Sequence, residues 1–242
     1  MTQPLFLEDA YLRDATGVVV DHTPEGGVVL DQSIFYATGG GQPGDSGTLT
    51  WGSTHLNVAT CVKIEGRENP RSALVPAEPA PLPPIGTQVT QSLDWERRHA
   101  LMRVHTALHL LSVVIPLPVS GGSISAGKGR LDFNMPDAPN DKDALEQSLN
   151  ALIELDFVVS TDWITDAELQ VNPGLVKTMS VMPPMGKGHV RLVRIGDDVR
   201  QIDLQPCGGT HVARTSEIGR IRLGKVEKKG KQNRRVYLHL DS

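Results

Sequence analysis

Four residues of this 242-residue chain have the types and spacing of a transition-metal site. His105 and His109 stand four positions apart in a segment with helical periodicity, which places both imidazoles on one helix face, one turn apart. Such a pair, taken alone, is more often solvated or packed against a core than bound to metal. The residue after His105 is Thr106, so the HExxH pattern with its glutamate base is absent.

Cys207 and His211 form a second pair, in the stretch PCGGTHV. The two glycines between them let the backbone fold tightly enough for a thiolate and an imidazole to converge on one ion. Three imidazoles and one thiolate favour Zn²⁺ over hard cations. We therefore expect one zinc ion, either catalytic or, in a closed and saturated site, structural.

A glycine-rich stretch, FYATGGGQPGDSG, runs from Phe35 to Gly47. It lacks a Lys-Ser/Thr ending and a following helix, so a phosphate-binding P-loop is not expected. A tight turn in a β domain is one interpretation. The other is close approach of the backbone to a ligand at Gly39, Gly40 and Gly41, with Thr38 and Gln42 offering polar side chains at the edges.

Basic residues gather near the end of the chain, although the formal net charge is -4. Between Arg214 and Arg235 nine Lys or Arg stand against two Glu. Clustered cations of this kind can contact RNA phosphates, but a solvated surface hairpin is an equal alternative. The candidate RNA-binding residues are Lys228, Lys229, Lys231, Arg234 and Arg235.

The elements that must position these residues differ between the two halves of the chain. From about Tyr11 to Asp94, short β segments alternate with Gly- and Pro-containing turns, which is typical of a small barrel. The segments are GVVVDH, GGVVLD, SGTLTW, THLNVATCVKI and TQVTQSLDW. Five prolines between Pro76 and Pro84 indicate either a linker or a loop inside the β domain.

After Asp94 the hydrophobic period becomes helical. Leu101, Val104, Leu108 and Leu111 predict a helix that ends before Pro116, and a second helix is expected over residues 141–157. Strands are expected in HVRLVRI, VRQIDL, GRIRLGKVEKK and RRVYLHL, the last two paired through a turn containing Gly230. The second half is therefore α+β.

Composition points to a globular protein, with 39% hydrophobic and 21% charged residues and a mean hydropathy of -0.20. Only Cys61 and Cys207 are present, so no disulfide framework is expected. No apolar run approaches the roughly 20 residues of a membrane span, and the N-terminus lacks signal-peptide features. We expect a cytoplasmic protein with no obligate protein partner.

Three separated motifs resemble the AlaX proteins, free-standing relatives of the editing domain of alanyl-tRNA synthetase. They are IFYATGGGQPGDSG, DWERRHALMRVHTALHLLS and CGGTHVARTSEIG, and the likeness covers most of the chain. The resemblance implies an α+β fold, with a small β-barrel over residues 1–94 and a zinc-binding editing domain over 95–242, its helices packed on an antiparallel sheet. It would make Thr87–Leu93 the last barrel strand and the proline cluster a barrel loop.

The resemblance also implies a function, hydrolysis of the ester of mischarged Ser-tRNA(Ala), with Gly-tRNA(Ala) as a further candidate. It assigns substrate-binding roles to the stretch from Thr38 to Gln42, with Thr38 near the amino acid and Thr38 and Gln42 as the catalytic candidates. The alternatives are a tRNA-binding module with a structural zinc and no deacylase activity, and a hydrolase for another small ester or amide.

Two chemical questions stay open in the sequence. Four protein ligands would fill a tetrahedral zinc, so a catalytic ion must become five-coordinate or hold Cys207 or His211 loosely. The general base is also unassigned, because Gln42 cannot take a proton near neutral pH. Asp45 is the nearest carboxylate, and we interpret it as a turn residue.

Overall fold

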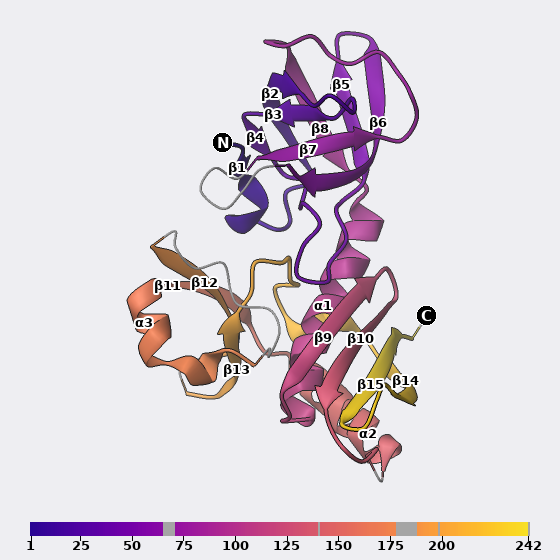
Figure 1. The fold of residues 1–242 in the computed structure, drawn as a ribbon, viewed down its shortest axis with the longest axis vertical. Coiled ribbons are helices and arrows are strands. Elements are labelled where there is room, and N and C mark those ends of the chain that lie inside the picture. Colours follow the sequence, from indigo (N-terminus) through magenta and orange to yellow (C-terminus); the bar gives the residue numbers. More distant parts are fainter. Residues whose placement is uncertain (65–70, 140, 178–187, 198, 242) are drawn as a thin grey trace. The chain divides into compact units, whose positions relative to one another are not determined.

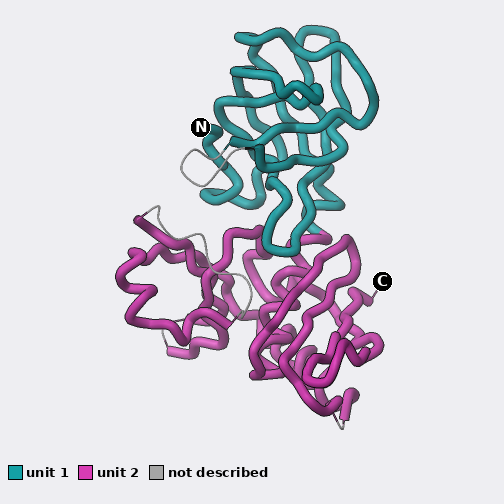
Figure 2. Tube along the Cα trace, in the orientation of Figure 1, with its two compact units in different colours: residues 1–99 teal, residues 100–242 magenta. Residues whose placement is uncertain are grey.

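The structure is a computed structural model that describes residues 1–64, 71–139, 141–177, 188–197 and 199–241. It divides into two compact units, unit 1 (residues 1–99) and unit 2 (residues 100–242), coloured separately in Figure 2. The division falls within helix α1 (Trp95–Val114). A domain boundary between residues 94 and 95 stays a prediction, and each unit is described by itself.

Unit 1 is a closed antiparallel barrel with the strand order β2-β3-β7-β6-β5-β8 (Figure 1). Its strands are β2 (Asp14–His22), β3 (Val28–Leu30), β5 (Gly47–Trp51), β6 (Thr54–Lys63), β7 (Ser72–Pro76) and β8 (Gln88–Leu93). A short parallel pair, β1 (Gln3–Pro4) with β4 (Gln32–Ser33), and the turn η1 (Leu5–Leu7) complete the unit. The expected barrel is confirmed, and the proline cluster starts at Pro76, the last residue of β7, and continues in the connection to β8.

The barrel interior is filled by alternating side chains of its strands, as closure of a small barrel requires. Leu56 and Val58 of β6 point inward, and a register shift after Val58 brings Cys61 into the same core. Phe35, Leu49 and Cys61 are each no more than 1% exposed. Cys61 is thus a core residue, and its burial raises the pKa of the thiol to about 12.

Helix α1 begins in unit 1, and its residues 100–114 belong to unit 2. Asp94 precedes it and its carboxylate accepts a hydrogen bond from the backbone N–H of Arg97 at 3.2 Å, which caps the first turn. Leu101, Val104 and Leu111 are fully buried, as the helical period predicts. The helix ends at Val114, before Pro116, which lacks the N–H needed to continue it.

A four-stranded antiparallel sheet of order β14-β15-β10-β9 packs on this helix. Its strands are β9 (Val119–Ser125), β10 (Lys128–Asn134), β14 (Ile221–Lys228) and β15 (Asn233–Leu240). The helix approaches closely at Gly129, where an added Cβ would stand 2.6 Å from a methyl group of Val104. The predicted β14–β15 hairpin is confirmed, and Gly230 in its turn has a φ of 105° that favours glycine.

The other elements of unit 2 include a second antiparallel sheet, of order β11-β12-β13. Its strands are β11 (Val159–Thr165), β12 (His189–Gly196) and β13 (Gln201–Pro206). The remaining helices and turns are α2 (Lys142–Glu154), α3 (Asp166–Val171), η2 (Pro173–Leu175) and η3 (Thr215–Ile218). The α+β prediction is thus confirmed, with two antiparallel sheets in place of one. No helix among the described residues is long and apolar enough to cross a membrane.

Candidate metal centre

The structure brings the two predicted metal pairs together inside unit 2. His105 and His109 project from one face of α1, and Cys207 and His211 come from the segment that follows β13. One nitrogen of each histidine and Sγ of Cys207 all lie within 4.8 Å of one another. The three imidazoles are each 6–7% exposed, so the cluster is shielded from bulk water.

The donor atoms of the cluster face one another across short distances. Sγ of Cys207 lies 3.4 Å from Nε2 of His105 and 3.3 Å from Nε2 of His211. Tetrahedral zinc with bonds of about 2.0–2.3 Å separates its ligand atoms by about 3.5 Å. The residues present therefore fit a metal ion in their donor chemistry and in these separations.

His109 is oriented by a carboxylate behind it. Its Nδ1 lies 3.0 Å from Oδ2 of Asp203, which is fully buried and also accepts a hydrogen bond from the amide of Gln205 at 2.7 Å. Lys177 donates to the other oxygen of Asp203. We assign the proton of this pair to Nδ1 of His109, because a histidine that binds metal through one nitrogen usually donates the other N–H to such a partner. Nε2 is then the nitrogen that binds an ion once it has lost its own proton.

His211 has a matching support on α1. The hydroxyl of Thr106 donates to the carbonyl of Met102 at 2.9 Å and accepts from the N–H of Val212 at 3.2 Å. Nδ1 of His211 lies 3.2 Å from the same oxygen. Since the hydroxyl has one proton and gives it to Met102, Nδ1 of His211 is the donor. This tautomer leaves Nε2 of His211 as a ligand.

The turn that carries Cys207 is held by a buried arginine of β12. One guanidinium nitrogen of Arg191 donates to the carbonyls of Cys207 and Gly209, both at 2.9 Å, and the N–H of Cys207 donates back to the carbonyl of Arg191. Arg191 is 8% exposed. These three bonds fix the backbone on which the thiolate stands.

The charges within the cluster suit metal binding. Burial raises the pKa of Cys207, but the imidazoles of His105 and His211 outweigh it and bring the pKa well below its usual range. Burial and the charge of His105 also drive the pKa of His211 well below its usual value. Burial lowers the pKa of His109, but Asp203 and Cys207 outweigh it and raise the pKa to about 9. Thiolate and neutral imidazole are the forms that bind metals, so binding should release the proton held by His109.

In unit 1 the glycine-rich stretch forms a two-residue hairpin. Gly39 and Gln42 exchange both backbone hydrogen bonds, and Gly40 and Gly41 between them have φ of 57° and 82°. Positive φ at both central residues is the geometry of a type I′ turn, which favours glycine. The ammonium group of Lys63 lies against this turn, because a Cβ on Gly39 would stand 2.9 Å from it.

Thr38 and Gln42 differ in exposure. Thr38 is exposed, and its hydroxyl donates to the carbonyl of Cys61 at 3.2 Å and accepts from the N–H of Gly44 at 2.9 Å. A hydroxyl has two acceptor sites, so one remains available. The side chain of Gln42 is 1% exposed. The structure thus shows Thr38 bonded to strand β6 and to its own loop, with one acceptor site left over.

Asp45 is more than a turn residue. It is 1% exposed, its carboxylate accepts from the N–H of Tyr36 at 2.6 Å, and both its oxygens lie 3.0 Å from Nε of Arg98. Arg98, also 1% exposed, further donates to the carbonyls of Ala10 and Ile34. The pair attaches the glycine-rich loop to the first turns of α1. The Asp45 carboxylate, the nearest candidate base in the sequence, is therefore engaged by Arg98.

The predicted RNA-binding residues fall in different surroundings. Lys228, Lys229 and Lys231 are exposed. Arg234 is 8% exposed and donates to the carbonyl of Pro136, whereas Arg235 forms a two-point ion pair with Asp132 at 2.8 and 2.9 Å.

Sequence reasoning missed the residues that support the metal ligands, Thr106, Arg191, Asp203 and Gln205. A signal existed for two of them. Asp203, Gln205 and Cys207 alternate along β13 and its extension, and alternate residues of a strand share a face. Had that face been read from the predicted strand, the two polar residues would have been placed beside the thiolate.

Comparison with known proteins identifies the family of this chain. The threonyl and alanyl tRNA synthetase second additional domain matches residues 190–237, and the tRNA synthetases class II (A) family matches residues 12–97. The alanyl-tRNA editing protein AlaX-M of Methanosarcina acetivorans is 32% identical over 99% of both chains. This chain belongs to the AlaX family. AlaX-M of Saccharolobus solfataricus is 33% identical over 98% of both chains.

Longer proteins contain a region similar to this chain. The alanine–tRNA ligase of Pyrobaculum arsenaticum is 34% identical over 94% of this chain, but the match covers only 25% of the ligase. This AlaX-family chain thus spans about a quarter of such ligases, and their ligase activity is not carried over to it.

Proposed function

We propose that this AlaX-family chain is a zinc-dependent hydrolase that cleaves the ester of mischarged Ser-tRNA(Ala), with Gly-tRNA(Ala) as a second substrate. The observation that carries the proposal is the buried convergence of three imidazoles and one thiolate in a chain of an editing family. A thiolate among the ligands favours Zn²⁺ over Mg²⁺ or Ca²⁺.

The zinc ligands in this proposal are His105, His109, Cys207 and His211. When bound, zinc supplies Lewis acidity that can polarise an ester carbonyl or lower the pKa of water towards about 7. Cys207 acts as a ligand and not as an acyl carrier, because its sulfur lies among the three imidazoles. The pairing of Asp203 with His109 and of Thr106 with His211 holds both rings in the required tautomer.

Thr38 reads the amino acid in this proposal. Serine exceeds alanine by one oxygen, so a sieve by size cannot admit serine and exclude alanine. A site that accepts a hydrogen bond from the serine hydroxyl can prefer serine to alanine, because alanine would leave the acceptor unpaired. The unused acceptor site on the exposed hydroxyl of Thr38 supports this role.

Backbone groups of Gly39, Gly40 and Gly41 complete the substrate-binding turn in this proposal, and Gln42 is assigned to hold the ester or water by its amide. Gln42 is 1% exposed, so this contact requires the turn to open. As an amide it takes no part in proton transfer near neutral pH.

The basic segment near the C-terminus supplies contacts to tRNA phosphates. The assigned residues are Lys228, Lys229, Lys231, Arg234 and Arg235. Exposure of the three lysines supports such contacts. Arg234 and Arg235 are engaged by the protein itself, which suits a role in shaping the hairpin on which the lysines stand.

A tRNA-binding module with a structural zinc is the second candidate. It is favoured by one observation, the proximity of all four donor atoms, because a closed four-ligand set is typical of structural zinc.

Deacylation assays separate the two candidates. Purified protein would be incubated with Ser-tRNA(Ala), Gly-tRNA(Ala) and Ala-tRNA(Ala), with and without a chelator. The proposal predicts chelator-sensitive release of serine and, more slowly, glycine, with Ala-tRNA(Ala) spared. Binding of tRNA without hydrolysis of any of the three would favour the structural-zinc module.

A further inference from the structure

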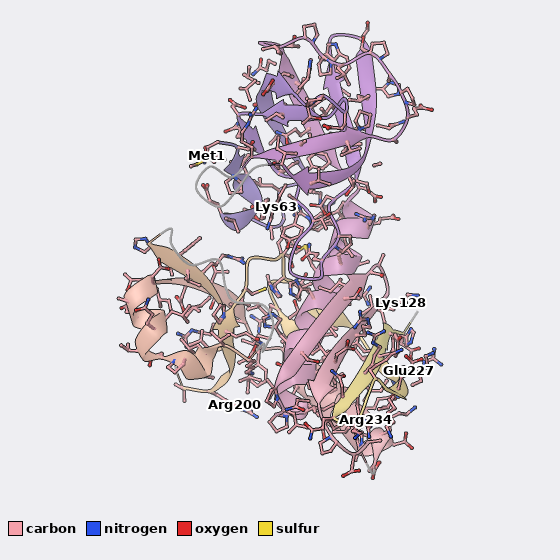
Figure 3. All side chains as sticks on the ribbon, in the orientation of Figure 1. Met1, Lys63, Lys128, Arg200, Glu227 and Arg234 are labelled. Carbon is pink, nitrogen blue, oxygen red and sulfur yellow. The ribbon has the colours of Figure 1, made fainter. Side chains whose placement is uncertain are left out.

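The four-stranded sheet of unit 2 has one face against α1 and one face towards solvent. Gly129, Val236 and Leu238 are buried on the helix side. Because side chains alternate across a strand, their neighbours Lys128 and Tyr237 lie on the opposite side. Lys128 is exposed and extends from this sheet together with Glu227 (Figure 3).

Strand register brings the basic residues of this solvent side into adjacent rows. On the central strand β15, His239 is flanked by Lys128 of β10 and Arg222 of β14. Tyr237 is paired with Arg130. We define the outer basic face as the cations that surround Tyr237, namely Lys128, Arg130, Arg222, Lys225 and Arg235.

Two carboxylates on this side are each shared by two cations. Asp132 receives Arg130 at 2.7 Å and Arg235 at 2.8 Å. A second carboxylate, Glu227, pairs with Lys225 and with Lys229.

Other cations of the face are not neutralised. Within the described parts of the chain, Lys128 and Arg222 have no carboxylate partner. Both are exposed. The face therefore carries an excess of positive charge on a chain whose formal net charge is -4.

A hollow of about 580 Å³ lies at the β14 edge of this face. Arg222, Lys225 and His239 line it from the sheet, and Lys142, Asp143 and Glu146 line it from α2. The carboxylate of Glu146 accepts the N–H of Leu223 at 2.7 Å, so it is held at the strand edge. The cations Arg222 and Lys225 thus lie on the sheet side of the hollow, and the carboxylates lie on the α2 side.

We propose that the outer basic face binds the phosphodiester backbone of tRNA, an inference that rests on the proposed function for its choice of RNA. Exposed Lys and Arg on adjacent strands can neutralise several phosphates without reading bases, and release of counterions supplies the affinity. The hydroxyl of Tyr237 donates to Glu227 at 3.2 Å and can still accept from a ribose hydroxyl, and the nearby Ser123 and Ser125 of β9 suit similar contacts.

This assignment divides the basic hairpin into two sets. Arg235 and Lys229 share carboxylates with the outer basic face. Lys228 is paired in register with Arg234 on the opposite side, and Lys231 lies in the turn. Position on the sheet, and not number of charges, should decide the effect of each residue on RNA binding.

Binding of an uncharged tRNA(Ala) transcript tests the proposal. Affinity would be measured by fluorescence anisotropy across a range of salt, in chelator, so that metal and hydrolysis play no part. The double variant Lys128→Gln/Arg222→Gln is compared with the matched control Lys228→Gln/Lys231→Gln. Each removes two exposed positive charges, and thermal melting checks that both fold.

We expect the outer double variant to weaken binding by about tenfold or more at low salt and to reduce the slope of log affinity against log salt by roughly 1.4–1.8, since each phosphate contact contributes about 0.7–0.9. Lys228→Gln/Lys231→Gln removes two of the hairpin contacts of the proposed function and should also weaken binding, but by clearly less than the outer double variant does. Lys128→Arg/Arg222→Lys, which keeps the charge, should bind as the wild type does.

The proposal would be overturned by an equal loss of affinity in both double variants or by a loss only in Lys228→Gln/Lys231→Gln. It would also be overturned if the wild type did not bind the transcript, or if the same residues bound phosphatidylserine vesicles more tightly than tRNA. Deacylation assays distinguish this failure from failure of the proposed function. If the wild type hydrolyses Ser-tRNA(Ala) and the outer double variant has the same KM, the proposed function stands and the outer basic face is not the tRNA-binding surface. If tRNA binds through this face and no aminoacyl-tRNA is hydrolysed, the binding surface stands and the proposed function is wrong.

Discussion

Asp203 accepts a hydrogen bond from Nδ1 of His109 at 3.0 Å and thereby fixes which nitrogen of that ring faces the metal cluster. We expect Asp203→Asn to weaken zinc binding by about 10- to 100-fold, as is usual when the carboxylate behind a histidine ligand is lost. Competition with a chromophoric chelator measures this. Gln205 also donates to Asp203, and Gln205→Glu replaces this donor by a carboxylate of the same size. The zinc affinity of this variant is compared with that of Asp203→Asn. Unchanged zinc affinity in Asp203→Asn would remove the positioning role.

Arg98 and Asp45 form a buried pair that holds the glycine-rich loop to α1. Removal of one charge leaves the other buried without its partner, so Asp45→Asn should lower the free energy of unfolding by about 3–5 kcal/mol. The double variant Asp45→Asn/Arg98→Met should lose less than the sum of the single variants. Urea denaturation of all four proteins measures this coupling. Simple additivity would show that the two side chains do not stabilise each other.

Asp132 links stability to pH in unit 2. Burial raises its pKa, but hydrogen bonds from Arg235 and Arg130 outweigh burial and hold the pKa below 3.8. A carboxylate with a depressed pKa stabilises the fold above its unfolded-state pKa, and this stabilisation is lost as pH falls through the folded-state pKa. The free energy of unfolding of the wild type should therefore exceed that of Asp132→Asn by about 1–3 kcal/mol at pH 7, and this difference should shrink below about pH 4. A difference independent of pH would contradict this.

Thr38 is expected to recognise the serine of Ser-tRNA(Ala) through its hydroxyl. Thr38→Val keeps the shape but removes the acceptor, so deacylation of Ser-tRNA(Ala) should fall by about one to two decades relative to Gly-tRNA(Ala). Thr38→Ser retains the hydroxyl and should keep the wild-type ratio. Because Val also loses the bond from Gly44, the rate ratio is measured and not the rate alone. A Ser/Gly ratio equal to that of the wild type would confine Thr38 to its own turn.

Local patterns in the sequence predict most elements of this fold. The period of Leu101, Val104 and Leu108 predicts α1, and alternating segments predict five of the six barrel strands. Strand β7 was not predicted, because its five residues contain only a short apolar core and end at Pro76. The β9–β10 hairpin was not predicted either. Its glycines weaken the strand pattern, and Gly129 is explained only by the approach of α1.

The candidate site is predicted to a similar extent. Spacing and residue type suggest the four metal-binding residues, since each pair is local in sequence. The support of the site is not local: Asp203 meets His109 across 94 positions, and Arg98 meets Asp45 across 53. Such pairings depend on strand register and helix placement, which composition and period do not specify. The sorting of Arg235 and Lys228 onto opposite sides of a sheet has the same cause.

Zinc reconstitution tests the central claim most directly. Metal-free protein would be titrated with Zn²⁺ while zinc content and the rate of Ser-tRNA(Ala) deacylation are measured on the same samples, with His105→Ala and His109→Ala as variants. The account predicts that activity rises in proportion to bound zinc, saturates at about one ion per chain, and is lost together with zinc in both variants. Full activity in protein verified to be free of metal would contradict it.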